Sequence, residues 1–304
     1  MIYSGDDQIR RVFTGSDEVT AIYRGDGQCF TPPIITFDDD NVKAICVANW
    51  GGNIVPNEIT EMEAAAVTTL VPSGGSQSAF RGNTSIETFN ELKYFTGLTT
   101  LNAAFRDCTN LTQITFPAAP LSGNTCLTDC VGKTKVKIVD LRPLKINQSV
   151  AVNVRLHVDS SAAMEEVYFP QMRVRTLYYA FSGWTKLKKI DFSRCDFGNM
   201  TASVSSQSTT VGTFGNCTSL TTIVGGFQGL GSYNGTGAKF NTQTFSLAAC
   251  PITHDNAVEI LESLGTPPVA SASPKITFKA STYNTLTADE KAIATAKKWQ
   301  VASA

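Results

Sequence analysis

The hydrophobic positions of the first thirty residues recur every ten residues. In each unit an apolar–aromatic pair is followed by a glycine and then by another apolar residue. The aromatic and glycine positions are Tyr3 and Gly5, Phe13 and Gly15, and Tyr23 and Gly25. Because glycine readily adopts the positive φ of tight turns, each unit fits a short strand, a glycine turn and a second short strand. We predict a β segment over residues 1–31 that is too small to bury a core alone, and we expect these six residues to serve assembly with the body, a partner or copies of the chain.

The spacing of apolar residues becomes helical between residues 32 and 75. It predicts one helix over residues 38–50, stopped by Gly51, and a second helix near Thr60, where Thr60 and Glu63 fit a capping box. The three aspartates at 38–40 fit a helix N-terminus, where carboxylates are favoured, better than a cation site.

A longer pattern recurs between residues 76 and 250. It reads Phe-x-x-(Cys/Trp/Asn)-Thr-x-(Leu/Ile)-x-x-(Ile/Phe), and its copies begin at Phe80, Phe105, Phe181 and Phe214. Each copy leaves apolar surface that only its neighbours can cover, so the copies should stack. The long gap between the second and third copies leaves open whether residues 117–163 are degenerate repeats or an insertion. Polar, glycine-containing stretches at 198–212 and 225–237 are predicted loops, where recognition commonly takes place.

Residues 251–304 are expected to close the stack, since repeat arrays need polar ends. A helix is predicted from Thr253 and a strand over residues 276–278. A second capping box at Thr287 and Glu290 should open a helix that runs through Lys298, followed by a short strand at residues 299–301.

Composition and charge exclude several classes of function. The 304 residues are 42% hydrophobic and only 17% charged, with a net charge of −1, so no basic footprint for nucleic acid is present. No signal-peptide pattern opens the sequence, and no apolar run is long enough to cross a membrane, so we expect a protein that is soluble in the cytoplasm where it is made. The eight cysteines form no CxxC pair and are interpreted as buried small hydrophobes.

Catalytic chemistry is not indicated. The two histidines, His157 and His254, complete no triad and no zinc spacing, and no glycine-rich phosphate loop is present. We therefore predict a non-enzyme without catalytic, cofactor-binding or metal-binding residues, and interpret His254 as structural. The candidates for a surface that contacts a sugar or a protein are aromatic, with a place in the core as the alternative: Tyr178, Tyr179, Trp184 and Tyr233.

The four repeats resemble the BspA-type (treponemal-type) leucine-rich repeat over most of residues 76–250. Residues 42–67 resemble the calcium-loop cap that precedes such repeats in proteins of gut Bacteroidales and their phages. The loop at 51–57 lacks the carboxylates that calcium needs, so we predict a cap that binds no calcium. Residues 253–255 and 286–296 look like the closing unit of the same proteins. The resemblance implies an α+β repeat fold, an irregular leucine-rich-repeat solenoid with helical caps and a short N-terminal β-repeat segment.

The decapeptide block resembles segments of phage tail and fibre proteins. This implies a virion structural protein of a Bacteroidales phage, a head or tail fibre or a decoration subunit. Residues 1–31 would dock on other virion proteins or on copies of the chain, and the solenoid would bind a glycan or protein of the host surface. The alternatives are a bacterial cell-surface adhesin of the BspA type and an intracellular scaffold.

Overall fold

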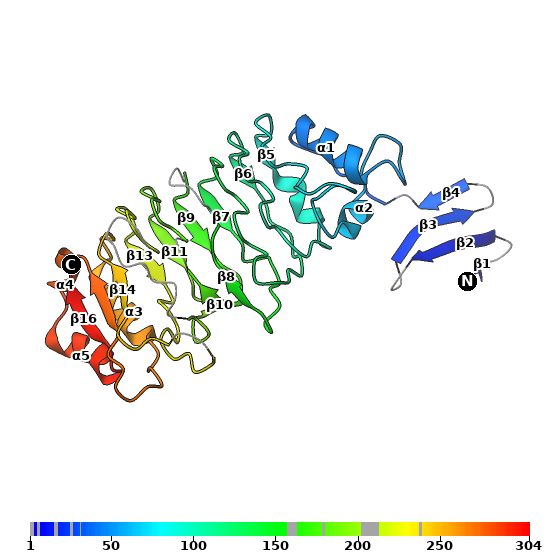
Figure 1. Ribbon diagram of the computed structural model, residues 1–304. Helices are drawn as coiled ribbons and strands as arrows, with labels where there is room; N and C mark the ends of the chain where they lie inside the picture. The colour runs from blue at the N-terminus through cyan, green and yellow to red at the C-terminus, as the bar shows by residue number, and fades with distance from the viewer. Residues whose placement is uncertain are drawn as a thin grey trace.

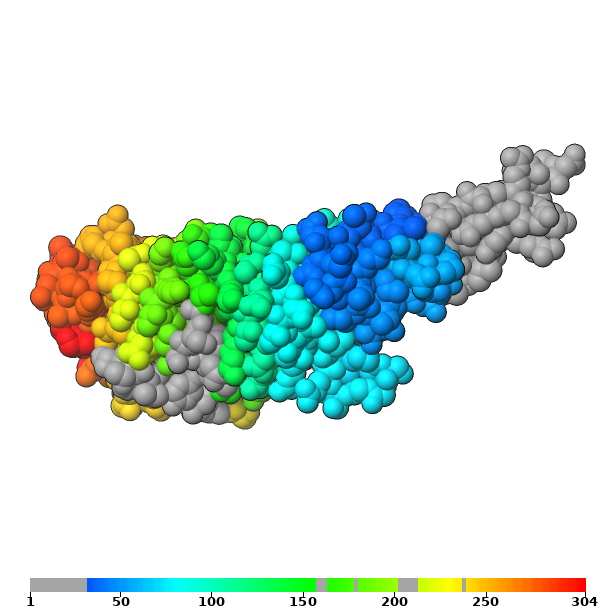
Figure 2. Space-filling view, turned by 90° about the horizontal axis from the view of Figure 1, so that it is seen from above, coloured from blue at the N-terminus to red at the C-terminus, as the bar shows by residue number. Residues whose placement is uncertain are grey.

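The computed structural model describes the backbone of four strands within the first thirty residues, and residues 32–156, 163–177, 180–201, 213–236 and 239–304. The described chain mixes a few helices with several sheets of short parallel strands. From residue 32 onward, successive segments follow one another along an elongated body, as the order of colours in Figures 1 and 2 shows. No helix in the described residues is long and apolar enough to cross a membrane.

The N-terminal sheet is antiparallel, with the order β1-β2-β3-β4. Its strands are β1 (Tyr3–Ser4), β2 (Asp7–Thr14), β3 (Glu18–Arg24) and β4 (Gly27–Phe30). The strand β2 joins the second half of the first decapeptide to the first half of the next, so the two short strands expected per unit are parts of longer ones. The ten-residue period is therefore the distance from one strand to the next in a meander.

Two helices follow. The helix α1 (Asp40–Trp50) has Asp39 as its N-cap, and α2 (Glu61–Ala66) carries the predicted capping box between Thr60 and Glu63. The carboxylate of Asp39 accepts hydrogen bonds from Asn41 N and Val42 N of the helix, which confirms the interpretation of the aspartates as a helix start.

Two rows of short parallel strands follow these helices along the body (Figure 1). The first row holds β5 (Thr88–Phe89), β6 (Gln113–Ile114), β7 (Ile138–Asp140), β9 (Glu166–Tyr168), β11 (Lys189–Asp191) and β13 (Thr222–Val224). The second row holds β8 (Ala151–Asn153), β10 (Met172–Thr176) and β12 (Cys195–Asp196). A 3-10 helix, η1 (Asn90–Tyr94), follows β5.

The described part of residues 117–163 continues the same stacking. Phe105 N donates to Cys130 O at 2.9 Å and Asp107 N to Gly132 O at 2.8 Å, so the turn at 130 lies one repeat after the turn at 105. Lys135 N donates to Leu111 O at 2.8 Å and links the β5-β6 sheet to the next four strands. The described residues 117–156 therefore continue the backbone bonding between successive turns, which favours degenerate repeats over an insertion.

The repeated phenylalanines all belong to one buried core. Phe181 and Phe214, one repeat apart, stack with ring centroids 5.4 Å apart and planes inclined by 8°. The Cys position adds a hydrogen bond, because Cys108 Sγ donates to Phe80 O at 2.9 Å and Cys217 Sγ donates to Phe181 O at 3.0 Å. The seven cysteines whose side chains are described are buried and free of disulfides, which confirms the prediction for them.

A further regularity of the repeat is the backbone conformation two positions after each phenylalanine. The residues there, Gly82, Asp107, Gly183 and Asn216, all have positive φ, between 60° and 83°. Glycine, aspartate and asparagine tolerate this left-handed conformation best, so the turn selects residue type at a position that the hydrophobic pattern does not reveal.

The C-terminal residues form a parallel sheet, β14-β15-β16, with helices beside it. The elements are β14 (Thr244–Leu247), α3 (His254–Ser263), β15 (Lys275–Phe278), α4 (Ala280–Tyr283), α5 (Ala288–Ala296) and β16 (Gln300–Ser303). The predicted capping box at Thr287 opens α5. The helix ends two residues earlier than predicted, because Lys298 has a φ of 66° that breaks it.

Candidate functional site

The outward side of the first strand row is mostly polar. In each of its three-residue strands the middle residue is buried and its neighbours face outward. Most outward residues are charged or neutral polar, but Ile138 is 56% exposed. An exposed isoleucine at the centre of a polar row is a candidate contact point for another molecule.

A hollow of about 820 Å³ lies around Ile138. We call it the lysine hollow, and it is lined by Asn90, Thr112, Gln113, Ile114, Lys135, Lys137, Ile138, Ala163 and Lys186. The strand register pairs Ile138 with Glu166 and Glu166 with Lys189, so Lys135, Ala163 and Lys186 hold the same position in three successive repeats. The short side chain of Ala163 between two lysines leaves the space open.

Positive charge exceeds negative charge at the lysine hollow. Glu165 lies 2.6 Å from Lys188 Nζ and 3.6 Å from Lys137 Nζ, and the hydrogen bond from Lys188 lowers the pKa of Glu165. Lys135 Nζ donates only to the neutral Asn110 Oδ1, at 2.7 Å. Lys186 is exposed and makes no polar contact within the described part of the chain. Three lysines therefore line the hollow, Lys135, Lys137 and Lys186, and the carboxylates nearby are those of Glu165 and of Glu166, the strand neighbour of Ile138.

Tyr168 is the aromatic side chain of the same strand face, and cations occupy both its sides. The guanidinium of Arg142 lies 4.5 Å from the ring centroid and Lys189 Nζ lies 4.9 Å from it. Its hydroxyl donates to Glu166, a hydrogen bond that raises the pKa of Tyr168. The ring is therefore engaged by neighbouring side chains and offers no open face for stacking.

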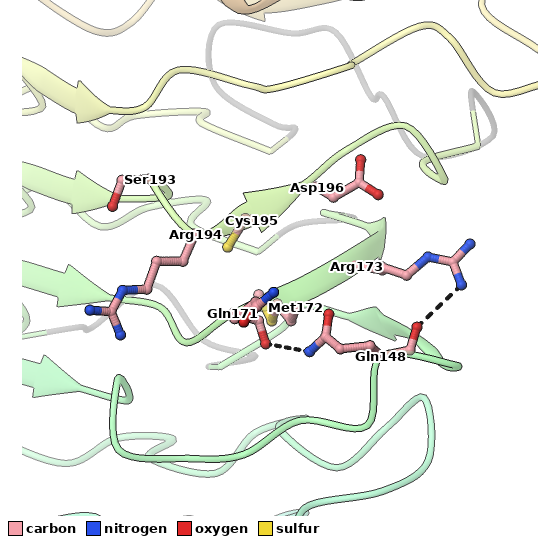
Figure 3. Close-up of a pocket in the computed structure, with 8 residues that line it drawn as sticks. All are labelled: Gln148, Gln171, Met172, Arg173, Ser193, Arg194, Cys195 and Asp196. Atoms are coloured by element: carbon pink, nitrogen blue, oxygen red, sulfur yellow. Dashed lines mark hydrogen bonds between the residues drawn. The ribbon is translucent and has the colours of Figure 1, made fainter.

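A second hollow, of about 660 Å³, lies beside the second strand row (Figure 3). Its polar groups mainly hold one another. Gln148 Nε2 donates to Gln171 O at 2.8 Å, and Arg173 donates to Gln148 O and to Asn199. Figure 3 shows Arg173 and Arg194 extending in opposite directions, so the two cations do not converge on one ligand position.

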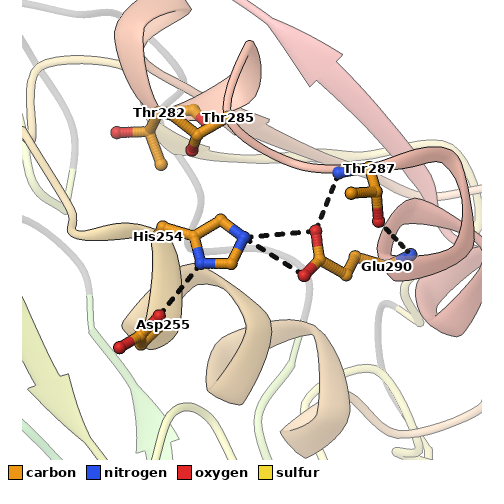
Figure 4. A network of polar contacts seen from close by, with 6 residues as sticks. All are labelled: His254, Asp255, Thr282, Thr285, Thr287 and Glu290. Carbon is orange, nitrogen blue, oxygen red and sulfur yellow. Dashed lines mark hydrogen bonds and ion pairs between the residues drawn. The ribbon is translucent and has the colours of Figure 1, made fainter.

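The polar cluster at His254 joins two helices of the C-terminal part (Figure 4). His254 Nδ1 lies 3.0 Å from Asp255 Oδ1, and Nε2 lies 3.1 Å from Glu290 Oε1. These two carboxylates raise the pKa of His254. Glu290 also accepts a hydrogen bond from Thr287 N at 2.7 Å in the capping box of α5. The contacts fit the structural role predicted for His254; His157 lies outside the described residues.

The four aromatic residues proposed from the sequence as surface contacts have different outcomes in the structure. Tyr178 and Tyr179 lie outside the described residues. Trp184 is fully buried and packs edge-to-face on Phe181 at 5.2 Å, so its assignment to an exposed surface is wrong. It fills the slot that Cys108 and Cys217 occupy in other repeats, where neighbouring turns enclose it. Tyr233 is half-buried, and its hydroxyl donates to Thr236 O at 3.1 Å.

The assembly candidates belong to the N-terminal sheet. Tyr3, Phe13 and Tyr23 lie in β1, β2 and β3, and the structure describes their backbone only. Gly5, Gly15 and Gly25 lie outside the described residues, directly after the last residues of those strands.

The carboxylate of Glu63, in α2, binds backbone N–H groups of the loop after α1. Glu63 Oε1 accepts hydrogen bonds from Asn53 N at 2.9 Å and Ile54 N at 3.1 Å, and Oε2 accepts from Thr60 N at 2.8 Å. Backbone N–H groups therefore occupy both oxygens of the Glu63 carboxylate. No cluster of three or more metal-binding side chains occurs among the described residues, and the absence of calcium binding stays a prediction.

Comparison with known proteins finds a coarse likeness. No protein-family model and no curated protein matches the chain. Among solved structures it is similar to an internalin (InlF) of Listeria monocytogenes, with 12% sequence identity, 88% of this chain and 95% of that chain covered, and a TM-score of 0.18. This is a coarse resemblance to a leucine-rich-repeat protein. At so low a TM-score it carries no argument for the function.

The sequence patterns did not identify the residues of the lysine hollow. Ile138 falls in a weak copy of the repeat, and the lysines are scattered along the chain. Aligning the repeats by strand register brings Lys135, Ala163 and Lys186 into one column. That alignment needs repeat lengths of 28 and then 23 residues, which are clear only once the strands are paired.

Proposed function

We propose that the chain is an irregular leucine-rich-repeat solenoid of the BspA type that binds another surface through its first strand row. The observation that carries the proposal is the lysine hollow, where an exposed isoleucine on a parallel sheet lies among three lysines, two of which have no acidic partner within the described residues. Two further features support a repeat solenoid: each turn bonds to the next through its backbone, and the phenylalanine positions stack into one core. We propose a binding role and no catalysis, with no cofactor.

We further propose that the protein is a virion structural protein of a Bacteroidales phage, a fibre or decoration subunit. The decapeptide block, whose strands form a meander of their own, supports this proposal through its resemblance to tail and fibre segments. Residues 1–31 would dock on other virion proteins or on copies of the chain, and the solenoid would face the host surface.

The test of docking is deletion of residues 1–31 in the phage genome. We expect particles that lack the protein, while the shortened chain, purified alone, keeps the thermal unfolding midpoint of the full chain. A matched control variant, Lys145→Gln, alters an exposed side chain of the solenoid and should be incorporated normally. Normal incorporation of the shortened chain would refute the docking role.

The test of surface binding is the attachment of purified full-length protein to host cells. Saturable attachment is expected, and absence of attachment would refute the recognition role. Fractionation of phage-free cells addresses the adhesin alternative, because the protein would then be found on the bacterial surface and not in particles.

A further inference from the structure

We propose that the lysine hollow binds an acidic peptide segment of a partner protein, in which an apolar side chain is flanked by carboxylates. The apolar side chain would contact Ile138 and Ile114, and the carboxylates would pair with Lys135 and Lys186. This inference rests on the binding role proposed for the first strand row and names the chemistry of its partner.

The apolar contact point is unusual for this molecule. Only two large hydrophobic side chains are exposed among the described residues, Ile34 at 45% and Ile138 at 56%. Ile138 lies beside the partly buried Ile114, and both line the hollow. A small apolar floor with a polar rim has the anatomy of a protein-binding hot spot, where a buried side chain is surrounded by groups that exclude water.

The charge around this floor selects an anionic partner. Lys135 and Lys186 hold equivalent positions two repeats apart, which places their backbones roughly 10 Å from each other. Neither has an acidic partner within the described residues, and Lys137 shares Glu165 with Lys188. Among the described residues, none that lines the hollow carries a carboxylate. Incoming carboxylates would therefore meet ammonium groups that are not already neutralised.

The side chains at the rim favour a peptide over an acidic sugar. Sugar-binding surfaces depend on open aromatic faces, and the described strand face offers none, because Tyr168 is covered on both sides and Trp184 is buried. Gln113 instead lines the hollow with a side-chain amide that makes no hydrogen bond to the described residues, and such an amide can donate to and accept from a peptide backbone.

The experiment measures binding of the full-length protein to two short fluorescent peptides by anisotropy. In the first, a leucine is flanked on each side by aspartates; in the second, asparagines replace the aspartates. We expect binding of the first peptide alone, weakened by added salt because exposed charges are screened. The double variant Lys135→Gln, Lys186→Gln and the variant Ile138→Ser should each lower the affinity by about tenfold or more, whereas Lys145→Gln should leave it unchanged.

Several results would overturn the proposal. Failure to bind the acidic peptide, equal binding of the two peptides, or equal affinity of the wild type and the hollow variants would each do so. Lysine-dependent binding of oligogalacturonate without binding of the peptide would assign the hollow to an acidic glycan instead. All of the substituted side chains are exposed, so the variants should fold, and a thermal unfolding midpoint equal to that of the wild type verifies it.

Host attachment separates this inference from the broader function. If the hollow variants attach to host cells as well as the wild type does, the binding role stands and the assignment of the lysine hollow fails. If the wild type does not attach at all, the broader proposal fails regardless of what the peptides show.

Discussion

The two ends of the first strand row are closed by side chains of helices, but with different chemistry. At the first end, the carboxylate of Asp39 accepts hydrogen bonds from Glu87 N at 2.7 Å and Thr88 N at 3.4 Å, at the start of β5. At the other end, Asn256 Oδ1 accepts from Ile223 N at 2.6 Å, and Asn256 Nδ2 donates to Ile223 O at 2.9 Å. Each arrangement pairs backbone groups that an open sheet edge would leave exposed.

The difference lies in how many residues share the task. Asp39 carries most of the task at the first end and also caps α1, so its buried carboxylate receives four backbone N–H groups, while Asn41 Nδ2 donates to Ser85 O at 3.4 Å. In α3 the task is divided along one face, because Glu259 accepts from Gly225 N at 2.6 Å and Ser263 from Phe227 N at 2.7 Å. Residues three and four apart share a helix face, so α3 places a polar ladder against β13. One end depends on a single charge, the other mainly on a row of hydrogen bonds.

The largest effect is expected from Asp39→Ala. The substitution removes the acceptor of four N–H groups, which combines loss of a helix cap with buried donors left unpaired, and should lower the free energy of unfolding by about 3 kcal/mol. Chemical denaturation monitored by circular dichroism measures the loss. A loss no larger than that of an ordinary exposed N-cap would show that water replaces the carboxylate at β5.

A smaller loss is expected from Asn256→Ala. The variant leaves the N–H and the carbonyl of Ile223 without their partner, and Glu259 and Ser263 still hold the rest of the edge, so we expect about 2 kcal/mol. The same denaturation experiment measures it. Equal losses for Asn256→Ala and Asp39→Ala would remove the distinction between the two ends.

The response to acid should separate the ends further. Burial raises the pKa of Asp39, but the hydrogen bonds from Glu87, Asn41, Thr88 and Val42 outweigh it, and the net pKa lies below the ordinary 3.8. The stability that this charge contributes is therefore present above the pKa of the unfolded chain and is lost as pH falls through the lower folded value. The unfolding free energy of wild type minus that of Asp39→Asn should therefore shrink on acidification through this window. A difference that does not depend on pH would contradict the role of the charge.

The smallest effect is expected at His254, whose contribution to stability is lost as pH rises. Its pKa is raised above 6.5 by Asp255 and Glu290, so its contribution is fully present below pH 6.5 and is lost as pH rises through the folded pKa. The imidazole is exposed, and solvent screens its contacts. Thermal unfolding of His254→Gln should therefore match the wild type at high pH and start slightly earlier below pH 6.5. A variant that is equally stable at both pH values would show that the link between α3 and α5 contributes nothing.

Elements with a local signal were predictable. The capping boxes at Thr60 and Thr287 involve residues three positions apart, and both are formed as expected. The repeat copies at Phe80, Phe105, Phe181 and Phe214 all place the phenylalanine in the core. Such features depend on chain neighbours or on a side chain's hydrophobicity, which the amino-acid order states directly.

Features that depend on which segments meet were not predictable. Trp184 was predicted to be a surface candidate because it lies near two tyrosines in the sequence. Its side chain is nevertheless fully buried at the position that cysteine occupies in other repeats. The repeats in residues 117–156 lack the full pattern, and backbone bonds to turns 25 residues away identify them.

The amino-acid sequence by itself determined the ten-residue period at the N-terminus, the helix starts with capping boxes and the core position of the repeated phenylalanines, because each follows from local conformation or apolar character. The tertiary structure alone decided that Lys135, Ala163 and Lys186 share one column beside an exposed Ile138. It also decided that Asp39 and Asn256 close opposite ends of a strand row. The physical reason is the same for both: irregular repeat lengths hide the register in the sequence, and only hydrogen bonds between strands distant along the chain establish it.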